Sequence, residues 1–136
     1  MSFMLRTAGA VHAFIYRRGI ARKMGKMPLV LLTTTGRKSG QPHTVALGAV
    51  PEGDGWIVIA SNGGADVDPS WWLNMVTNPN VTVQMNDQVI KARMQEITNP
   101  ADRERIWNTA VANVKSYANY AMKTSRVIPL GWIRPV

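Results

Sequence analysis

Residues 28–50 read PLVLLTTTGRKSGQPHTVALGAV, two apolar, partly β-branched stretches on either side of a basic turn. Residues 29–35 are too few for a confident helix, and their composition favours a strand. The turn of residues 36–42 contains two glycines and a proline, which are typical of chain reversals. Residues 43–50 form the return strand. The stretch therefore predicts an antiparallel hairpin with a long basic tip.

Outside this hairpin the chain alternates between short strands and helices. Asp68-Pro69 and Asn99-Pro100 each place a side-chain acceptor before a proline, a common start of a helix. Apolar residues alternate in the predicted strands and recur at helical spacing in the predicted helices. The predicted strands are residues 56–60, 81–85, 89–97 and 127–133, and the predicted helices are residues 3–18, 70–77 and 99 to about 116 or beyond.

The order of these elements indicates a mainly β fold with added helices, of the α+β class. Six strands joined mostly by turns pair in antiparallel fashion. Short links favour a small barrel or a strongly curled sheet with helices packed outside it. A length of 136 residues is enough for one compact domain and not two, so residues 1–136 are expected to form a single domain.

The composition excludes several classes of protein. A hydrophobic fraction of 46% with 18% charged residues excludes a disordered chain. No apolar run approaches the ~18–20 residues of a membrane span, which excludes a transmembrane protein. The chain has no cysteine, so disulfides, thiolate metal sites and cysteine nucleophiles are excluded, and a reducing cytoplasm is the expected compartment.

The formal charge of +8 comes entirely from the first part of the chain. Residues 1–51 carry eight basic residues and no acid, whereas residues 52–136 carry eight of each sign. This asymmetry indicates a polyanionic partner: a nucleic acid, an acidic membrane surface or a phosphorylated cofactor. The basic residues lack the interleaved aromatic side chains of a base-stacking surface, so no nucleic-acid partner is expected.

The tip of the hairpin, residues 33–40, has the composition of a phosphate-binding turn. Two glycines let backbone N–H groups face an anion, Arg37 and Lys38 neutralise it, and the hydroxyl groups add neutral donors. The alternative is a solvated hairpin tip, in which glycine and basic residues are also common. Composition alone slightly favours the solvated tip.

A second candidate region runs from the predicted strand that ends near residue 60 to the helix that starts near residue 70. The glycine pair in residues 60–64 allows the backbone to approach a flat ligand closely. Trp71 and Trp72 are adjacent on a short helix and cannot both face one way, so one belongs to the core and the other is free to line a cofactor pocket. The alternative is that both tryptophans are core residues.

Tyr117 and Tyr120 form a third candidate region. Their three-residue spacing places both phenol groups on one helical face, where they can donate a proton or a hydrogen bond into a pocket. Ordinary amphipathic packing is the alternative. The two histidines, His12 and His43, lie far apart without an acid at ligand spacing, so no metal site is expected. No nucleophile-elbow, dinucleotide-binding or P-loop motif is present.

Together, these motifs resemble the deazaflavin-dependent nitroreductase family of actinobacteria. The likeness extends over about residues 28–130, through the segments 33–42, 60–64, 69–74, Asn78-Pro79, Ser116-Tyr117, Tyr120 and 126–129. The resemblance implies a split β-barrel similar to FMN-binding proteins. It also implies coenzyme F420, an 8-hydroxy-5-deazaflavin with a phosphodiester and a polyglutamate tail, as the cofactor.

The resemblance further implies a role for individual residues. Tyr117 and Tyr120 are expected on the substrate side as the catalytic candidates. The residues expected to bind the cofactor are Thr35, Gly36, Arg37, Lys38, Ser39, Gly40, His43, Ala60, Ser61, Asn62, Gly63, Gly64, Trp71 and Asn74.

The activity that the resemblance implies is hydride transfer from reduced F420 to a small electrophilic acceptor: a quinone, an enone or a nitroaromatic compound. The alternative is a protein of the same fold that binds deazaflavin, FMN or haem without turnover. Whether FMN replaces the deazaflavin, and whether the protein is a monomer or a homodimer, stay open at this stage.

The N-terminal segment, residues 1–22, is predicted to be a basic amphipathic helix. Such a helix can lie on an anionic membrane, which would place the protein at the inner face of the cell membrane and suit a quinone substrate. The alternative is a helix packed on the barrel, with its arginines near the tail of the cofactor.

Overall fold

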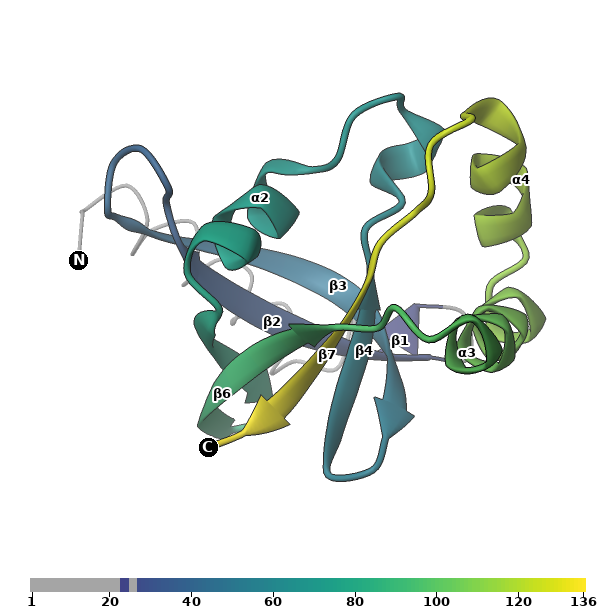
Figure 1. Cartoon of the computed structure of the whole chain (residues 1–136). Helices are drawn as coiled ribbons and strands as arrows, with labels where there is room; N and C mark the ends of the chain where they lie inside the picture. Colours follow the sequence, from purple (N-terminus) through teal and green to yellow (C-terminus); the bar gives the residue numbers. More distant parts are fainter. Residues whose placement is uncertain (1–22, 25–26) are drawn as a thin grey trace.

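A computed structural model describes residues 23–24 and 27–136. The helix predicted over residues 3–18, and with it the membrane association of residues 1–22, lies outside the described residues. The strands are β1 (Lys23–Met24), β2 (Met27–Thr35), β3 (Pro42–Glu52), β4 (Gly55–Ile59), β5 (Asn80–Met85), β6 (Gln88–Glu96) and β7 (Leu130–Pro135). The helices are the 3-10 turn η1 (Asn62–Gly64), α2 (Ser70–Thr77), α3 (Pro100–Asn113) and α4 (Ser116–Lys123) (Figure 1).

Six of these strands close into a barrel. The strand order is β2-β3-β4-β7-β6-β5, and β5 pairs again with β2. Each of these pairings is antiparallel. Closure leaves β1 as a two-residue addition that pairs with β2. The prediction of an α+β split barrel of about six antiparallel strands is confirmed.

The barrel has apolar side chains on both faces of its central strands. In β4, Val58 belongs to the cluster inside the barrel, which α2 extends with Trp72 and Met75. Its neighbours Ile57 and Ile59 belong to a second cluster that α3 and α4 cover. Because successive residues of a strand face opposite sides, both faces of β4 are buried, which explains its continuous apolar sequence.

The two predicted helix starts behave differently. The Oδ1 atom of Asn99 accepts a hydrogen bond from the backbone N–H of Asp102 at 3.1 Å, so the predicted cap of α3 is confirmed. The prediction that Asp68 caps α2 is wrong. Pro69 occupies the N-cap position, without a side-chain capping bond, because the Asp68 carboxylate pairs instead with Arg126 at 2.6 Å.

The helix predicted to run to residue 116 or beyond is two helices. Helix α3 ends at Asn113, Val114 adopts an extended conformation (φ −138°, ψ 97°) and α4 begins at Ser116. Val114 packs against the second core cluster, which also holds Tyr117 from α4. The β-branched Val114 accommodates the extended conformation, and the chain direction changes while both helices stay on that cluster.

The last strand begins three residues later than predicted and ends two residues later, at Pro135. The carbonyl of Ile128 accepts a hydrogen bond from Nη2 of Arg103 at 2.8 Å, and Pro129 has no N–H to donate to a ladder. These two residues therefore do not form a complete ladder with β4, although the Pro129 carbonyl still accepts a hydrogen bond from the N–H of Ala60. Within the described part of the chain, no helix combines the length and the hydropathy that crossing a membrane requires.

Candidate functional site

The loop that joins β2 to β3 is fastened to α2 by one buried amide. Oδ1 of Asn74 accepts hydrogen bonds from the backbone N–H of Arg37 at 3.1 Å and from its Nη1 at 2.9 Å. Nη1 of Arg37 also lies 3.3 Å from the carbonyl of Ser70. The Nδ2 group of Asn74 donates to the hydroxyl of Thr34 at 3.2 Å. Asn74 and Thr34 are both buried, so a hydrogen-bond network anchored in the core fixes the base of the loop.

The rest of the loop is open and rich in donors. Arg37, Lys38, Ser39 and Gly40 are exposed, and the loop is closed by hydrogen bonds from Gly40 N–H to the Gly36 carbonyl and from Gly36 N–H to the Gln41 carbonyl. The backbone N–H groups of Lys38 and Ser39 donate to no described residue. Gly40 has φ +71°, and a Cβ at this position would meet no atom within 4 Å. Free N–H groups beside an ammonium and a guanidinium fit the phosphodiester of coenzyme F420.

Two further predicted residues flank this loop. Nε2 of His43 lies 3.4 Å from Oγ of Ser39, and Ser39 Oγ accepts a hydrogen bond from the N–H of Gln41 at 3.1 Å. A Cβ on Gly36 would lie 2.7 Å from His43 Nε2, so the histidine ring packs directly on that glycine. Thr35 lies at the end of β2 and lines a cavity of about 420 Å³ on the barrel wall. The loop, His43 and Asn74 therefore form one local structure.

Arg126 fixes the second candidate region. Its guanidinium donates to the carbonyls of Ala60 (3.2 Å), Ser61 (2.8 Å) and Ala65 (2.8 Å), and to the carboxylate of Asp68 (2.6 Å). These four bonds join residues far apart in the chain and hold the segment between β4 and α2 in one conformation. Sequence reasoning did not include Arg126 among the site residues, because nothing in local spacing signals a partner some 60 residues away.

The predicted residues of this segment have a special backbone. Ala60 and Ser61 are buried, and the N–H of Ala60 donates to the carbonyl of Pro129 at 3.0 Å. Asn62, Gly63 and Gly64 have φ of +48°, +63° and +85°, the left-handed region that favours glycine. The Nδ2 group of Asn62 donates to the carbonyl of Val67 at 3.1 Å. A tight left-handed turn therefore follows β4.

This turn lies directly against α4, which carries the two tyrosines (Figure 1). A Cβ on Gly64 would lie 2.8 Å from the carbonyl oxygen of Tyr120. The rings of Tyr117 and Tyr120 are 6.1 Å apart in an edge-to-face arrangement. The turn of residues 62–64 and the tyrosines of α4 therefore pack against each other, whereas the loop of residues 36–41 (the Arg37 loop) contacts α2.

The two tyrosines differ in exposure. Tyr117 is only 4% exposed and belongs to the second core cluster, whereas Tyr120 is half-buried. Burial raises the pKa of Tyr117 to about 12, and the neighbouring Tyr120 adds to the shift. The Tyr117 phenol therefore stays protonated at neutral pH. Nζ of Lys123 lies 5.8 Å from the ring centre of Tyr120.

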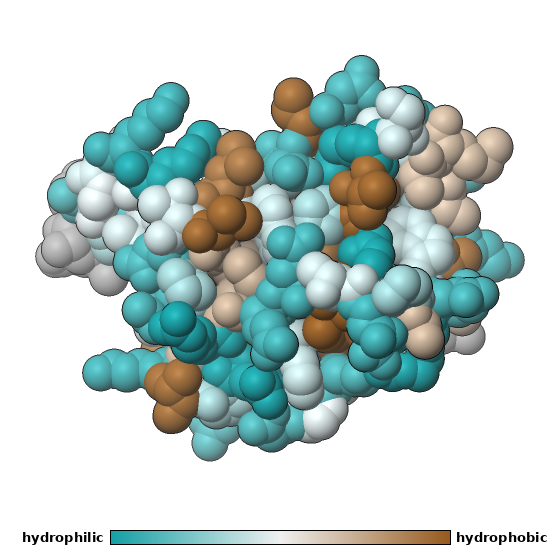
Figure 2. Space-filling model, in the orientation of Figure 1, coloured by the Kyte–Doolittle hydropathy of each residue, from teal (hydrophilic) through white to brown (hydrophobic). Residues whose placement is uncertain are grey.

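Both tryptophans of α2 pack against the cluster inside the barrel, Trp72 more deeply than Trp71. Trp72 is 3% exposed in the core, and Trp71 packs half-buried against the same cluster, with the rings 6.5 Å apart and nearly perpendicular. Figure 2 shows hydrophobic side chains emerging over the part of the surface where α2, η1 and α4 lie. The exposed large apolar residues in these elements and in the loops beside them are Val67, Leu73, Val76, Met122 and Val127.

We expect Gly64→Ala to lower the free energy of unfolding by about 2 kcal/mol more than Gly63→Ala. Both glycines have positive φ, so both alanines carry a similar backbone cost. Only the Gly64 methyl would meet α4, since a Cβ on Gly63 has no atom within 4 Å. Urea denaturation of the two variants measures the difference. Equal losses would mean that η1 does not pack on α4 as described.

The raised pKa of Tyr117 predicts a loss of stability at alkaline pH. The phenol ionises near pH 10.0 in the unfolded chain and near 12 in the folded protein, so the folded state binds more protons in that range. The free energy of unfolding therefore falls as the pH rises from 10 to 12, by up to about 1.4 kcal/mol per pH unit. Tyr117→Phe removes this component entirely, whereas Tyr120→Phe keeps the part due to burial and loses only the part that Tyr120 adds. Identical pH profiles for Tyr117→Phe and the wild type would contradict the burial of the phenol.

Comparison with known proteins shows which family this chain resembles. The model of the F420H(2)-dependent quinone reductase family matches residues 5–133. An F420H(2)-dependent quinone reductase of Mycobacterium tuberculosis (strain H37Rv) is 32% identical over 129 residues, which cover 93% of this chain and 87% of that protein.

Two solved structures agree with this result. An F420-H2 dependent reductase, FDR-A, is 40% identical, with a TM-score of 0.71 over 79% of this chain and 94% of the other. A protein described as a domain-swapped dimer is 34% identical, with a TM-score of 0.73 over 95% of each chain. The predictions of a deazaflavin-dependent oxidoreductase family and of coenzyme F420 as its cofactor are confirmed. The chain belongs to the F420H(2)-dependent quinone reductase family.

Proposed function

We propose that this protein reduces quinones and other small electrophiles with reduced coenzyme F420, and that the Arg37 loop holds the cofactor's phosphodiester. The observation that carries the proposal is the docking of Arg37 on α2 through Asn74. That contact fixes the loop and leaves Lys38 and two backbone N–H groups without a partner among the described residues. The mycobacterial relative named as an F420H(2)-dependent quinone reductase supports the choice of acceptor.

The remaining predicted residues orient the ring system of the cofactor in this proposal. The left-handed turn of residues 62–64 brings backbone close to a flat ligand, and Trp71 offers a half-buried aromatic wall on α2. Reduced F420, when bound, supplies the hydride for the acceptor. The chain supplies the geometry, because holding two rings in reacting distance removes much of the entropic barrier. The whole barrel acts as one deazaflavin-binding domain in this account.

The acceptor side is assigned to α4 and the apolar residues around it. Tyr120 is half-buried and is the phenol that can touch a substrate, where it donates a hydrogen bond or a proton to the reduced oxygen. Tyr117 supports its ring from the core at 6.1 Å. Exposed apolar residues such as Val67 and Met122 favour a hydrophobic acceptor, which suits a quinone.

Steady-state oxidation of reduced F420 under anaerobic conditions tests the function. We expect turnover on addition of menadione, with a cyclohexenone and a nitroaromatic compound as further acceptors. Tyr120→Phe lowers turnover and leaves cofactor affinity nearly unchanged, because Tyr120 lies apart from the Arg37 loop. If F420 binds saturably but no acceptor oxidises it, the proposed reductase function is wrong and the protein is a non-catalytic cofactor-binding protein.

A further inference from the structure

Two arginines occupy directly opposite positions on neighbouring strands of the barrel. Arg93 of β6 lies directly opposite Arg134 of β7 in the antiparallel register, and both residues are exposed. Like charges in directly opposite positions destabilise a sheet. Neither arginine forms an ion pair with a described residue. The pair therefore places two positive charges on neighbouring strands, and no described acid forms an ion pair with either.

Neutral partners hold both guanidinium groups in place. The Arg134 group lies 4.1 Å from the ring centre of Trp132, and its Nη2 donates to Oε1 of Gln95 at 3.2 Å. Nη1 of Arg93 donates to Oδ1 of Asn80 at 3.1 Å. These contacts fix the orientation of each group without cancelling its charge. A guanidinium has five N–H donors, so most of them stay available for an oxyanion.

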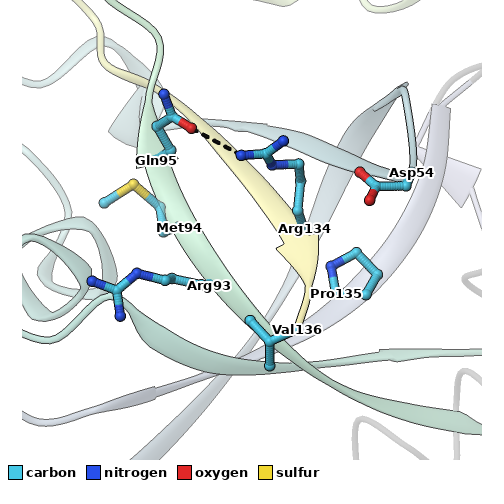
Figure 3. A pocket seen from close by; sticks show the side chains of 7 residues that line it. All are labelled: Asp54, Arg93, Met94, Gln95, Arg134, Pro135 and Val136. Atoms are coloured by element: carbon cyan, nitrogen blue, oxygen red, sulfur yellow. Dashed lines mark hydrogen bonds between the residues drawn. The ribbon is translucent and has the colours of Figure 1, made fainter.

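The two side chains line one cavity of about 500 Å³. Figure 3 shows the Arg134 side chain between Gln95 and Asp54, with Arg93 extending in another direction. Since the guanidinium groups diverge, a molecule that engages both must carry two separated anionic groups. Asp54, the acid that lines the cavity, opposes an anion and lowers its affinity.

This cavity is separate from the proposed cofactor loop. The Arg37 loop precedes β3, and Asp54 follows it, so the two lie at opposite ends of an 11-residue strand. At about 3.3 Å per residue, the strand spans roughly 30 Å. The cavity therefore does not belong to the Arg37 loop.

We propose that Arg93, Arg134 and Gln95 form a second binding site, for a small molecule that carries two separated oxyanion groups, carboxylate or phosphate. The site does not depend on the proposed reductase activity. Its ligand bridges the two guanidinium groups and relieves the repulsion between the opposed arginines.

Titration of the ¹⁵N-labelled full chain with glutarate at constant ionic strength tests the site. The reporter is the indole N–H of Trp132, whose ring lies under Arg134. We expect a saturating shift with half-saturation at about 1 mM or below. Butyrate, the matched monoanion, requires at least about tenfold more. Pyrophosphate in a parallel titration tells phosphate recognition from carboxylate recognition.

Variants separate this site from general attraction of anions. Arg93→Gln and Arg134→Gln each raise the half-saturation concentration about tenfold or more, and Asp54→Asn lowers it about two- to fivefold. Lys38→Ala, in the Arg37 loop, leaves the half-saturation concentration unchanged. Should Arg134→Gln disturb the fold, Arg134→Lys keeps the charge but loses the planar fork and still weakens binding. The proposal would be overturned if the Trp132 indole shift rose linearly, without saturation, with the concentration of both glutarate and pyrophosphate. It would also be overturned if the arginine variants left the half-saturation concentration unchanged.

Discussion

Arg126→Ala is expected to lower the free energy of unfolding by about 3–5 kcal/mol. The Arg126 side chain is 15% exposed, and its loss leaves the Asp68 carboxylate without its partner. The buried carbonyls of Ala60 and Ser61 lose their donor as well. An unpaired buried polar group keeps its full desolvation cost. Equilibrium denaturation in urea measures the loss, and Arg126→Lys restores only part of it because an ammonium cannot reproduce the fork of four bonds.

Arg105→Ala is the matched control for this prediction. Arg105 also pairs with a carboxylate at 2.6 Å, that of Glu52, but its side chain is 54% exposed. An ion pair in solvent contributes little to stability, so the control variant should unfold close to the wild type. If Arg126→Ala were as stable as Arg105→Ala, the segment between β4 and α2 would not depend on Arg126.

Replacing Arg37 and Lys38 together by alanine is expected to weaken F420 binding by at least about a hundredfold. Each charge-assisted contact that is lost contributes on the order of 1.5–3 kcal/mol. Lys38→Ala alone accounts for about tenfold and leaves the fold unchanged, because Lys38 is exposed and no described residue pairs with it. Isothermal titration calorimetry with oxidised F420 measures both variants.

Two further variants tell whether the affinity for F420 depends on this loop or on net charge. Asn74→Ala removes the acceptor that holds Arg37 on α2 and should weaken F420 binding even though Lys38 and Arg37 are intact. Arg105→Ala removes an exposed cation beside Glu52, at the other end of β3, and should leave the affinity unchanged. Loss of affinity with Arg105→Ala equal to that with Lys38→Ala would mean that F420 responds to net charge and not to this loop.

The hairpin of residues 28–50 and the helix over residues 70–77 were predictable because local signals agreed with the final packing. Alternating or continuous apolar runs matched the buried faces of the strands. The Asp68 cap failed for a different reason. The Asp68 carboxylate pairs with Arg126 and does not cap the helix. A local sequence pattern cannot reveal this pairing, because the two residues lie far apart in the chain.

The site was predictable in its parts but not in its connections. The sequence singles out the Arg37 loop for its glycines and charge, yet it does not reveal that Asn74, 37 residues away, holds that loop on α2. Likewise, the three-residue spacing of Tyr117 and Tyr120 places them on one helical face but does not reveal that Tyr117 is buried while Tyr120 is half-buried. That difference comes from the break at Val114, which sets how α4 packs on the second core cluster.

A single-turnover measurement shows whether this protein transfers a hydride from reduced F420 to a quinone. Wild-type protein in excess over reduced F420 is mixed rapidly with menadione under anaerobic conditions, and oxidation of the cofactor is followed. We predict a rate at least about a hundredfold above the rate without protein. The Arg37→Ala/Lys38→Ala variant should reach the same rate only at a much higher protein concentration. A wild-type rate no greater than that in buffer alone would contradict the assignment of this protein as an F420H2-dependent quinone reductase.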